Sequence, residues 1–369
     1  MKIAMFGIKG IPVPAGAENV AEQIGSRLVQ RGHEVTIYVR AHYTPRELKK
    51  YKGMRLIHLP SIPTKNLDTF THSFLACLHI LLFNRPDVVH IHSTGSSIFA
   101  LLPRLFGIKT VVQSHGLDWQ RVKWSPLAKL YLRLTDYSTL FFPNVTTVVS
   151  KKMAAYYQTM TCRPVIYIPN GVEYQEIRPA NLIHSLGLES REYILFAARF
   201  VPEKGAHYLI EAFSKVNTTK KLVLAGDGSY GDMYTEILKG HASDKIIFPG
   251  FIRGPLMEEL LSNAYAFVLP SEIEGLSIGL LEAMSYGNCV LASDIEENRE
   301  VLGEAGFTFE SKNVVELKNK LEYLLQNKQE VQTKRDLAKE RSRGFLSWEK
   351  VTDQIVSLYQ LISKGTKER

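Results

Sequence analysis

The chain has 369 residues, 45% of them hydrophobic, which is ordinary for a globular protein and long enough to divide into two domains. The formal net charge of +8 is unevenly spread, because residues 1–170 carry 21 Lys and Arg against 8 Asp and Glu, whereas residues 171–369 carry 24 against 29. The basic half predicts an anionic partner, such as lipid headgroups, a phosphorylated acceptor or nucleic acid, and the acidic half argues against nucleic acid wrapping the whole protein.

No segment has the pattern of a signal peptide or a membrane span. The N-terminus enters a strand pattern at Lys2, and the longest apolar stretch, residues 73–83, is interrupted by His79 and is too short to cross a bilayer. We expect a cytoplasmic protein that is soluble or peripheral on the inner face of the cell membrane. The cysteines are odd in number and lack metal-ligand spacing, so we expect buried, reduced thiols at Cys77, Cys162 and Cys289.

Short apolar strands alternate with helices through the first half of the chain. Strands are predicted at 2–7, 34–39, 88–91, 110–112, 145–149 and 165–168. A helix is predicted over 16–30, with Val20, Ile24 and Leu28 on one face. Apolar strands separated by helices indicate a parallel sheet with both faces covered.

The second half repeats this alternation. Strands are predicted at 193–197, 221–225, 245–248, 266–269 and 289–292, with helices such as 207–214 and 279–286 between them. The pattern predicts an α/β protein of two Rossmann-like domains that face each other across a cleft. We expect an N-terminal domain of residues 1–170, a C-terminal domain of residues 171–347, and a segment of residues 348–369 that packs back toward the N-terminal domain.

The last helix, Trp348 to Ser363, is amphipathic. We expect Val351, Ile355, Leu358 and Leu361 on its buried face.

Ligands of open α/β sheets bind outside the carboxyl ends of the strands, so the loops there are the first place to look for chemistry. After the first strand, a glycine-containing loop runs from Gly7 to Gly16 and leads into a helix, whose N-terminus offers free N–H groups to a phosphate. A plain strand-to-helix connection is the alternative. After strand 193–197, Arg199 and Lys204 are spaced to clamp a diphosphate.

Two more loops in the second half carry candidate site residues. Gly226, Asp227, Gly228 and Gly231 match a dinucleotide fingerprint, but no acidic residue ends a second strand where that motif requires one, so the loop is interpreted as lying near a nucleotide, not as an NAD site. The segment 270–284 carries Glu274 and Glu282 across a loop and the start of a helix. Each carboxylate can accept two hydrogen bonds from sugar or ribose hydroxyls.

These motifs resemble the family-4 glycosyltransferases, which have the GT-B fold, and the resemblance covers nearly the whole chain. It implies that Arg199 and Lys204 hold the donor diphosphate and that Glu282 takes the ribose hydroxyls. It implies that Glu274 holds the donor sugar, together with the amides of Gly275, Leu276, Ser277 and Ile278. The donor-binding residues also include Asn170 in Pro169-Asn170-Gly171, the group Gly226, Asp227 and Gly228, and Gly16, which approaches the phosphates from the other domain.

The N-terminal half is similar to a narrower branch of bacterial transferases, some described as rhamnosyltransferases, that build cell-surface polysaccharides. The segments Gly10-Ile11-Pro12 and 31–35 and the run from Ser114 to Trp124 carry this similarity. It places His115 against the donor sugar, as a catalytic residue beside Arg199, Lys204 and Glu274. The family's usual double glycine is Ala15-Gly16 here, so Gly16 is the better phosphate-binding candidate.

The resemblance implies a retaining, hexosyltransferase-type enzyme that moves a sugar from a nucleotide diphosphate to a glycan or lipid-linked acceptor in surface polysaccharide synthesis. The leaving phosphate would be stabilised by Arg199, Lys204 and helix dipoles and would guide the acceptor on the same face. A carboxylate nucleophile is the alternative, with Asp118 as its candidate. No cofactor and no metal are expected, since the two cations can neutralise the leaving group and no metal spacing is seen.

Two other functions stay open on the sequence: a sugar-nucleotide epimerase on the same fold and a non-catalytic nucleotide-sugar-binding protein. His90 and His92, at the end of strand 88–91, either line the cleft or follow ordinary strand patterning. The mixture of cations and aromatics at Arg121, Lys123, Trp124, Lys129, Tyr131 and Arg133 suits an anionic membrane surface. A solvated helix face with a buried Trp is the alternative there.

Overall fold

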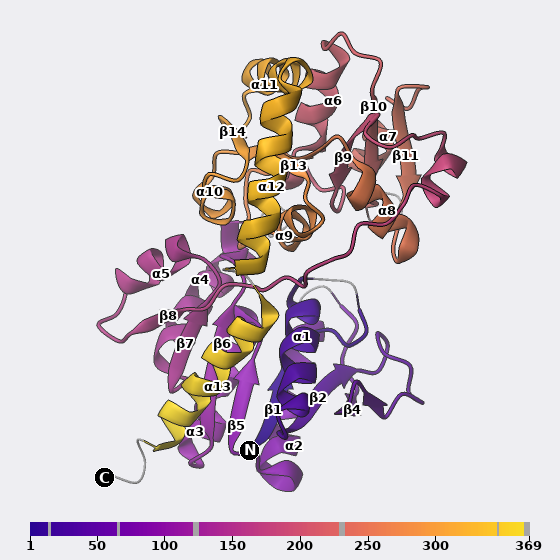
Figure 1. Cartoon of the computed structure of the whole chain (residues 1–369). Helices are drawn as coiled ribbons and strands as arrows, with labels where there is room; N and C mark the ends of the chain where they lie inside the picture. The colour runs from indigo at the N-terminus through magenta and orange to yellow at the C-terminus, as the bar shows by residue number, and fades with distance from the viewer. Residues whose placement is uncertain (14–15, 65–66, 121–124, 229–232, 345–346, 365–369) are drawn as a thin grey trace. The chain divides into compact units, whose positions relative to one another are not determined.

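The computed structural model describes residues 1–13, 16–64, 67–120, 125–228, 233–344 and 347–364 (Figure 1). They belong to two compact units. Unit 1 comprises Met1–Gly171 and the C-terminal segment from Trp348, and unit 2 comprises Val172–Ser347. Each unit has its own sheet and its own core, and each is described by itself.

Unit 1 is built on an eight-stranded sheet in the order β3-β4-β2-β1-β5-β6-β7-β8. All neighbouring strands are parallel except β3 and β4. The strands are β1 (Lys2–Phe6), β2 (Glu34–Arg40), β3 (Lys50–Tyr51), β4 (Met54–Leu59), β5 (Val88–Ile91), β6 (Lys109–Ser114), β7 (Val145–Val148) and β8 (Val165–Tyr167). The chain starts at the centre, runs outward to β4, and then returns to β5 and continues to the other edge.

Right-handed crossovers place connections that run in opposite directions on opposite faces of the sheet. One face is therefore covered by α1, and the other by the helices that follow β4, β5, β6 and β7. The helices of unit 1 are α1 (Gly16–Gln30), α2 (Leu67–His79), η1 (Ile80–Asn84), η2 (Thr94–Ala100), α3 (Leu101–Leu105), η3 (Asp118–Gln120), α4 (Pro126–Phe141), α5 (Lys151–Gln158) and α13 (Trp348–Lys364).

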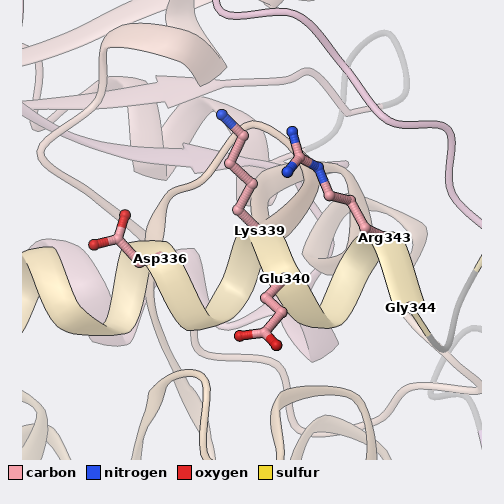
Figure 2. Close-up of a pocket in the computed structure, with 5 residues that line it drawn as sticks. All are labelled: Asp336, Lys339, Glu340, Arg343 and Gly344. Carbon is pink, nitrogen blue, oxygen red and sulfur yellow. The ribbon is translucent and has the colours of Figure 1, made fainter.

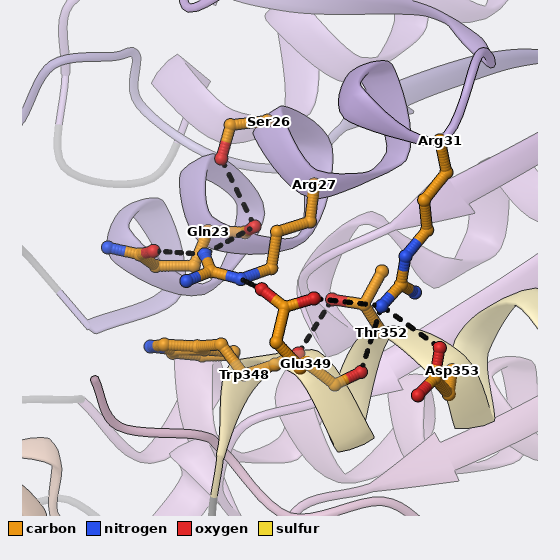
Figure 3. A network of polar contacts seen from close by, with 8 residues as sticks. All are labelled: Gln23, Ser26, Arg27, Arg31, Trp348, Glu349, Thr352 and Asp353. Carbon is orange, nitrogen blue, oxygen red and sulfur yellow. Dashed lines mark hydrogen bonds and ion pairs between the residues drawn. The ribbon is translucent and has the colours of Figure 1, made fainter. Parts of the chain in front are cut away.

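The last helix, α13, lies beside the first, α1, although more than 300 residues separate them in the chain (Figures 1 and 3). Arg27 Nε donates to Glu349 Oε1 at 2.7 Å, and Arg31 Nη2 lies 3.0 Å from Glu349 Oε2 and 2.9 Å from Asp353 Oδ1. Ion pairs at an exposed surface contribute little. The apolar face of α13 therefore supplies most of the free energy of its docking.

The buried face of α13 differs from the expected one at one position. Val351, Ile355 and Leu358 are buried as predicted, but Leu361 is 67% exposed and Tyr359 is buried in its place. Tyr359 is held by a hydrogen bond between its hydroxyl and His90 Nδ1 on β5, at 2.6 Å. This bond turns the buried stripe of α13 toward Tyr359 and leaves Leu361 in solvent.

Unit 2 has a six-stranded, fully parallel sheet in the order β11-β10-β9-β12-β13-β14. Its strands are β9 (Tyr193–Ala197), β10 (Lys221–Ala225), β11 (Ile246–Gly250), β12 (Ala266–Leu269), β13 (Cys289–Ser293) and β14 (Phe307–Phe309). Its helices are η4 (Leu182–Leu186), η5 (Pro202–Lys204), α6 (Ala206–Ser214), α7 (Met233–Lys239), α8 (Pro255–Asn263), α9 (Ile278–Ser285), α10 (Glu296–Leu302), α11 (Val314–Gln326) and α12 (Lys328–Gly344).

Two parallel α/β sheets with helical crossovers confirm the predicted class of two Rossmann-like domains.

The expectation of three buried thiols is wrong for Cys162, which is exposed after α5, whereas Cys77 and Cys289 are buried. None of the helices in the described part of the chain has the length and apolar character needed to cross a membrane.

The docking of α13 can be tested by comparing one buried with one exposed residue. We expect Ile355→Ala to lower the free energy of unfolding by about 2–4 kcal/mol, because Ile355 is fully buried and its loss leaves a cavity. Asp353→Ala, which removes one exposed ion pair, should cost less than about 1 kcal/mol. All three tryptophans of the chain, Trp119, Trp124 and Trp348, belong to unit 1, so denaturant unfolding followed by tryptophan fluorescence reports on this unit. Equal losses for the two variants would contradict apolar docking.

Candidate functional site

The strand order of unit 2 places a topological switch point between β9 and β12. The chain runs from β9 outward to β11 and then returns to β12, on the other side of β9. At such a point the loops after the two central strands diverge and leave a crevice at the carboxyl edge of the sheet, where ligands bind. The loop after β9 carries Arg199 and Lys204, and the loop after β12 carries Glu274.

The loops after β9 and β12 touch each other through their backbones. Gly205 has φ +71°, and a Cβ placed on it would lie 2.1 Å from the carbonyl oxygen of Pro270. Only glycine fits there, because the clash would be with backbone that cannot move aside. The amide of Glu272 also donates to the carbonyl of Glu203 at 2.9 Å. The two loops are therefore held in one fixed arrangement.

An ion pair links the side chains of these loops. Lys204 Nζ lies 2.5 Å from Glu274 Oε1, and the two side chains are 17% and 7% exposed. Arg199, on the same loop as Lys204, is exposed, and its side chain has no hydrogen bond or ion pair with the part of the chain that the structure describes. The structure thus joins two predicted site residues directly and leaves the Arg199 guanidinium available to an anion.

Helix α9 begins at the end of the loop after β12. Ser277 caps it, accepting a hydrogen bond from the amide of Leu280 at 3.3 Å, so this hydroxyl is already used within the helix. A Cβ on Gly279 would lie 3.5 Å from the carbonyl oxygen of Ala197, which places the first turn of α9 against the end of β9. The predicted donor-binding amides of Gly275 to Ile278 therefore belong to a loop and helix start at the switch point.

Glu282 lies one turn further along α9. Burial raises the pKa of its carboxyl to about 7, and no hydrogen bond or ion pair from the described residues offsets this cost. Burying an ionised carboxylate away from water without a partner costs free energy. Carboxyl groups with pKa values shifted in this way are found most often at functional sites. Glu282 is thus positioned to accept hydrogen bonds from a ligand, in contrast to Glu274, whose partner is already present.

The loop after β10 contributes packing to the same edge. A Cβ on Gly226 would lie 2.0 Å from the carbonyl oxygen of Ala198, so glycine is required for the close approach of the loop after β9. Asp227 accepts from the amide of Gly228 at 2.9 Å and pairs with Lys239 at 3.3 Å. Gly231, the last glycine of the fingerprint, lies outside the described residues, as do Ser229 and Tyr230.

In unit 1 the switch point lies between β1 and β5. The loop after β1 is held by Glu18 on α1, whose carboxylate accepts from the amide of Lys9 at 3.0 Å. Gly16 is the first residue of α1 and is exposed, and Ala15 lies outside the described residues. The start of α1, whose first-turn amides are the expected phosphate contacts, is therefore exposed at Gly16.

Three histidines form a row at this edge of unit 1. The rings of His90 and His92 stack with centroids 4.2 Å apart, and those of His92 and His115 with centroids 5.6 Å apart. Burial lowers the pKa of His90 to about 3 and that of His115 to about 4, and it holds the pKa of His92 well below its usual range. All three imidazoles are therefore neutral at pH 7.

The burial of His90 and His92 decides between the two alternatives left open on the sequence. Both side chains are almost fully buried, at 0% and 1% exposure, so they do not line an open surface and the strand-pattern interpretation holds. His115, which follows β6, is less buried and ends the row. The support of His115 by His92 was not predicted, although the H-x-H pattern after β5 was visible in the sequence.

Asn170 and Gly171 lie at the end of unit 1. Asn170 is buried, and a Cβ on Gly171 would lie 2.6 Å from the Trp348 side chain at the start of α13. The Pro-Asn-Gly motif thus has a packing role that its sequence did not reveal, because Gly171 allows the chain to pass close to Trp348.

The predicted site residues fall into two groups. Unit 2 gathers Arg199, Lys204, Glu274 and Glu282 around one switch point, with Gly226 supporting it, and unit 1 holds Gly16, His115 and Asn170. A surface pocket on α12 is lined by none of them but by Asp336, Lys339, Glu340, Arg343 and Gly344 (Figure 2). Among the described residues, no three His, Cys, Asp or Glu side chains are grouped to hold a metal ion.

Comparisons with known proteins match both halves of the chain. Residues 14–176 match the model of Glycosyltransferase Family 4, and residues 181–343 match that of Glycosyl transferases group 1. An uncharacterized glycosyltransferase of Methanocaldococcus jannaschii is 27% identical over 82% of this chain and 83% of its own. The O-antigen chain mannosyltransferase B of Escherichia coli is 26% identical over 64% of this chain and 61% of its own.

A solved structure has the same fold. The Anabaena protein HepE, in complex with UDP-glucose, superposes with a TM-score of 0.82 over 98% of this chain and 99% of that one, at 18% identity. Each half of the chain thus matches its own family model, in agreement with the two sheets. The chain belongs to the glycosyltransferases in which a family 4 domain precedes a group 1 domain, on the GT-B fold.

Proposed function

We propose that this glycosyltransferase is a retaining hexosyltransferase that moves a sugar from a nucleotide diphosphate to a glycan or lipid-linked acceptor in bacterial surface polysaccharide synthesis. The observation that carries the proposal is the placement of Arg199, Lys204, Glu274 and Glu282 on the loops and the helix start at the switch point of unit 2, with Lys204 and Glu274 in direct contact. The UDP-glucose bound to HepE supports the donor class, and the E. coli O-antigen mannosyltransferase supports the polysaccharide role.

The donor diphosphate is held by Arg199 and Lys204. The leaving nucleotide diphosphate gains negative charge as the bond to the sugar breaks, and fixed cations stabilise that charge in the transition state. Arg199 has a free guanidinium fork for a phosphate, whereas Lys204 shares its charge between Glu274 and the donor. These two cations take the place of a metal ion in the proposed mechanism, which uses no cofactor.

The two carboxylates divide the donor between them. Glu282, with no partner among the described residues, accepts hydrogen bonds from the ribose hydroxyls, and Glu274 accepts them from the sugar. The ion pair with Lys204 fixes the position of the Glu274 side chain. The loop amides of Gly275 to Ile278, the loop of Gly226 to Gly228 and, from unit 1, Gly16 and Asn170 complete the proposed donor contacts.

His115 binds the sugar as a neutral group in this mechanism. With a pKa of about 4, its imidazole is neutral at pH 7 and can donate a hydrogen bond to a sugar hydroxyl or accept one from it. Retention then follows from attack of the acceptor on the face that the leaving phosphate vacates. A nucleophilic Asp118 is the other route to retention, and its side chain lies outside the described part of the structure.

The proposed acceptor determines where in the cell the enzyme is expected to work. We propose that the enzyme works in the cytoplasm at the inner face of the cell membrane, where a lipid-linked acceptor is presented and the basic unit 1 meets anionic headgroups. Product analysis with and without acceptor separates this function from the two alternatives. An epimerase would change the sugar nucleotide without acceptor, and a binding protein would leave it intact in both reactions.

The diphosphate clamp is tested by two substitutions with different side effects. Arg199→Ala and Lys204→Ala should each lower kcat about a hundredfold, which corresponds to the loss of about 3 kcal/mol of transition-state stabilisation. Arg199→Ala should leave the free energy of unfolding unchanged. Lys204→Ala should also lower it by about 2–4 kcal/mol, because the buried Glu274 carboxylate loses its partner.

The matched control is Lys215→Ala, directly after α6, which removes an exposed cation paired with Glu211 in the same unit. This variant should keep both the kcat and the stability of the original protein. Near-normal kcat for both Arg199→Ala and Lys204→Ala, with a donor that the enzyme uses well, would show that the clamp is assigned to the wrong residues.

The raised pKa of Glu282 predicts a pH dependence of nucleotide binding. Below pH 7 the Glu282 carboxyl of the free protein is neutral. Ribose hydroxyls donate best to the ionised carboxylate, so nucleotide binding below pH 7 must release the proton of Glu282. The affinity for UDP should therefore rise with pH by up to about tenfold between roughly pH 6 and pH 8 and then level off.

Isothermal titration calorimetry with UDP measures this dependence. Glu282→Gln should weaken binding and remove the part of the pH dependence that comes from the protein, leaving only the titration of the phosphate itself. Glu274→Ala should spare UDP binding and damage sugar transfer. An identical pH profile in Glu282→Gln and the original protein would rule out the assigned ribose contact.

A further inference from the structure

Helix α4 of unit 1 buries mostly polar side chains and exposes most of its large apolar ones. Its buried side chains are Leu132, Thr135, Asp136, Ser138, Thr139 and Leu140, four of them polar. The large apolar side chains of the helix that are exposed are Leu127, Leu130, Tyr131, Leu134, Tyr137 and Phe141, at intervals of three, four and seven residues. A helix on a water-soluble surface normally turns its apolar stripe inward, so this stripe needs another explanation.

This orientation of α4 is fixed by specific partners of its buried polar side chains. Asp136 accepts hydrogen bonds from the Tyr157 hydroxyl at 2.9 Å and from the Tyr156 hydroxyl at 3.2 Å. The hydroxyls of Ser97 and Ser138 lie 2.5 Å apart. Turning the apolar stripe of α4 inward would break these buried bonds, so the exposed stripe is a stable property of the fold.

The neighbouring segment η2–α3 extends the exposed apolar area. Ile98, Leu101, Leu102, Leu105 and Phe106 are all exposed there, the last two at 71% and 66%. Three contacts join this segment to α4 along its length: Tyr131 to the carbonyl of Gly95, Ser97 to the carbonyl of Thr135, and Arg104 to the carbonyls of residues 141 to 143. The eleven side chains form one region, the α3–α4 apolar surface.

The part of the chain that carries this surface is rich in positive charge. Residues 88–171 carry 9 Lys and Arg but only 2 acidic residues, and one of the two, Asp136, is buried. Arg163 lies over the ring of Phe141 at 5.8 Å, and Arg133 lies over the ring of Trp119 at 4.5 Å. Large contiguous apolar patches with a polar rim mark binding surfaces, and cations beside aromatic rings suit the headgroup region of a bilayer.

We propose that the α3–α4 apolar surface inserts shallowly into an anionic lipid bilayer, with Lys129, Arg133 and Arg163 at the headgroups. Charge decides against a second copy of the chain as the occupant, because a symmetric contact would place two strongly basic surfaces against each other. The proposal deepens the proposed function, since it rests on that function for the lipid-linked acceptor and names the face that meets the membrane.

Insertion of apolar side chains predicts a different salt dependence of vesicle binding from the one that basic charge alone predicts. Charge alone predicts binding that high salt abolishes and that neutral vesicles do not show. Insertion of the α3–α4 apolar surface adds a part that salt does not screen, because burial of apolar area does not depend on charge. Arg121, Lys123 and Trp124, which were expected to contribute, lie outside the described residues. The described cations of the proposed membrane face are Lys129, Arg133 and Arg163.

The test is flotation of the full chain with two kinds of vesicle: phosphatidylcholine alone and an equimolar mixture with phosphatidylglycerol. The original protein should float with the anionic vesicles at low salt and, in smaller amount, at high salt. The triple substitution Leu127→Ser, Leu130→Ser and Leu134→Ser should lower the partition coefficient by about two orders of magnitude. Lys129→Glu with Arg133→Glu should remove only the part that depends on salt.

A matched control makes the same kind of change elsewhere. Met233, Ile237 and Val315 of unit 2 are exposed to a similar extent, and their triple change to Ser should leave vesicle binding unaltered. Calorimetry with UDP should give the same affinity for all these variants, since none is a proposed donor contact. If the original protein binds no nucleoside diphosphate, UDP included, the proposed function is overturned while the vesicle result still stands.

Three outcomes would overturn the membrane proposal. The first is flotation of the Leu127, Leu130 and Leu134 variant like the original protein, and the second is no flotation of the original protein with either vesicle. The third is a dimer in sedimentation velocity without vesicles that the same triple substitution converts to a monomer, together with absent vesicle binding. That third result would assign the surface to a second copy of the chain.

Discussion

The ion pair between Lys204 and Glu274 joins the loops after β9 and β12, and the candidate site depends on this junction. The pair is 2.5 Å long and well shielded from water, so each charge needs the other. Beneath it, Gly205 lets the backbone of one loop pass against the carbonyl of Pro270 in the other. The sheet brings the two loops to one switch point, and the ion pair with the glycine contact fixes their spacing.

This junction gives two glutamates of one segment different properties. Glu274 has its charge compensated within the protein, and Glu282, on α9, has a pKa raised to about 7 by burial without a compensating partner. A protein retains such an uncompensated carboxyl at a cost in stability. In the proposed function that cost is offset when donor hydroxyls bind, so the stability and the function of α9 oppose each other at Glu282.

Unit 1 departs from ordinary folding rules in two places. Its three stacked histidines are buried and neutral, and α4 buries mostly polar side chains and exposes most of its large apolar ones. Asp136 of α4 has a partner in Tyr157 and His90 has one in Tyr359, whereas both ring nitrogens of His92 are buried without a hydrogen bond to the described residues. Departures from the usual placement of polar and apolar side chains are expected at functional sites. We connect the exposed apolar side chains of α4 to membrane binding.

The sequence by itself determined the alternation of buried strands and helices, because apolar runs such as Tyr193–Ala197 bury both faces and are visible without any partner. It did not predict β4, in which the exposed Arg55 and the half-buried His58 interrupt the apolar run, nor the three-residue β14. The direction in which a helix turns its stripe was decided only by tertiary structure. Periodicity predicted the apolar face of α13 but did not predict α4. In both helices the buried side is held by contacts with other elements, between Tyr359 and His90 in α13 and between Asp136 and Tyr157 in α4.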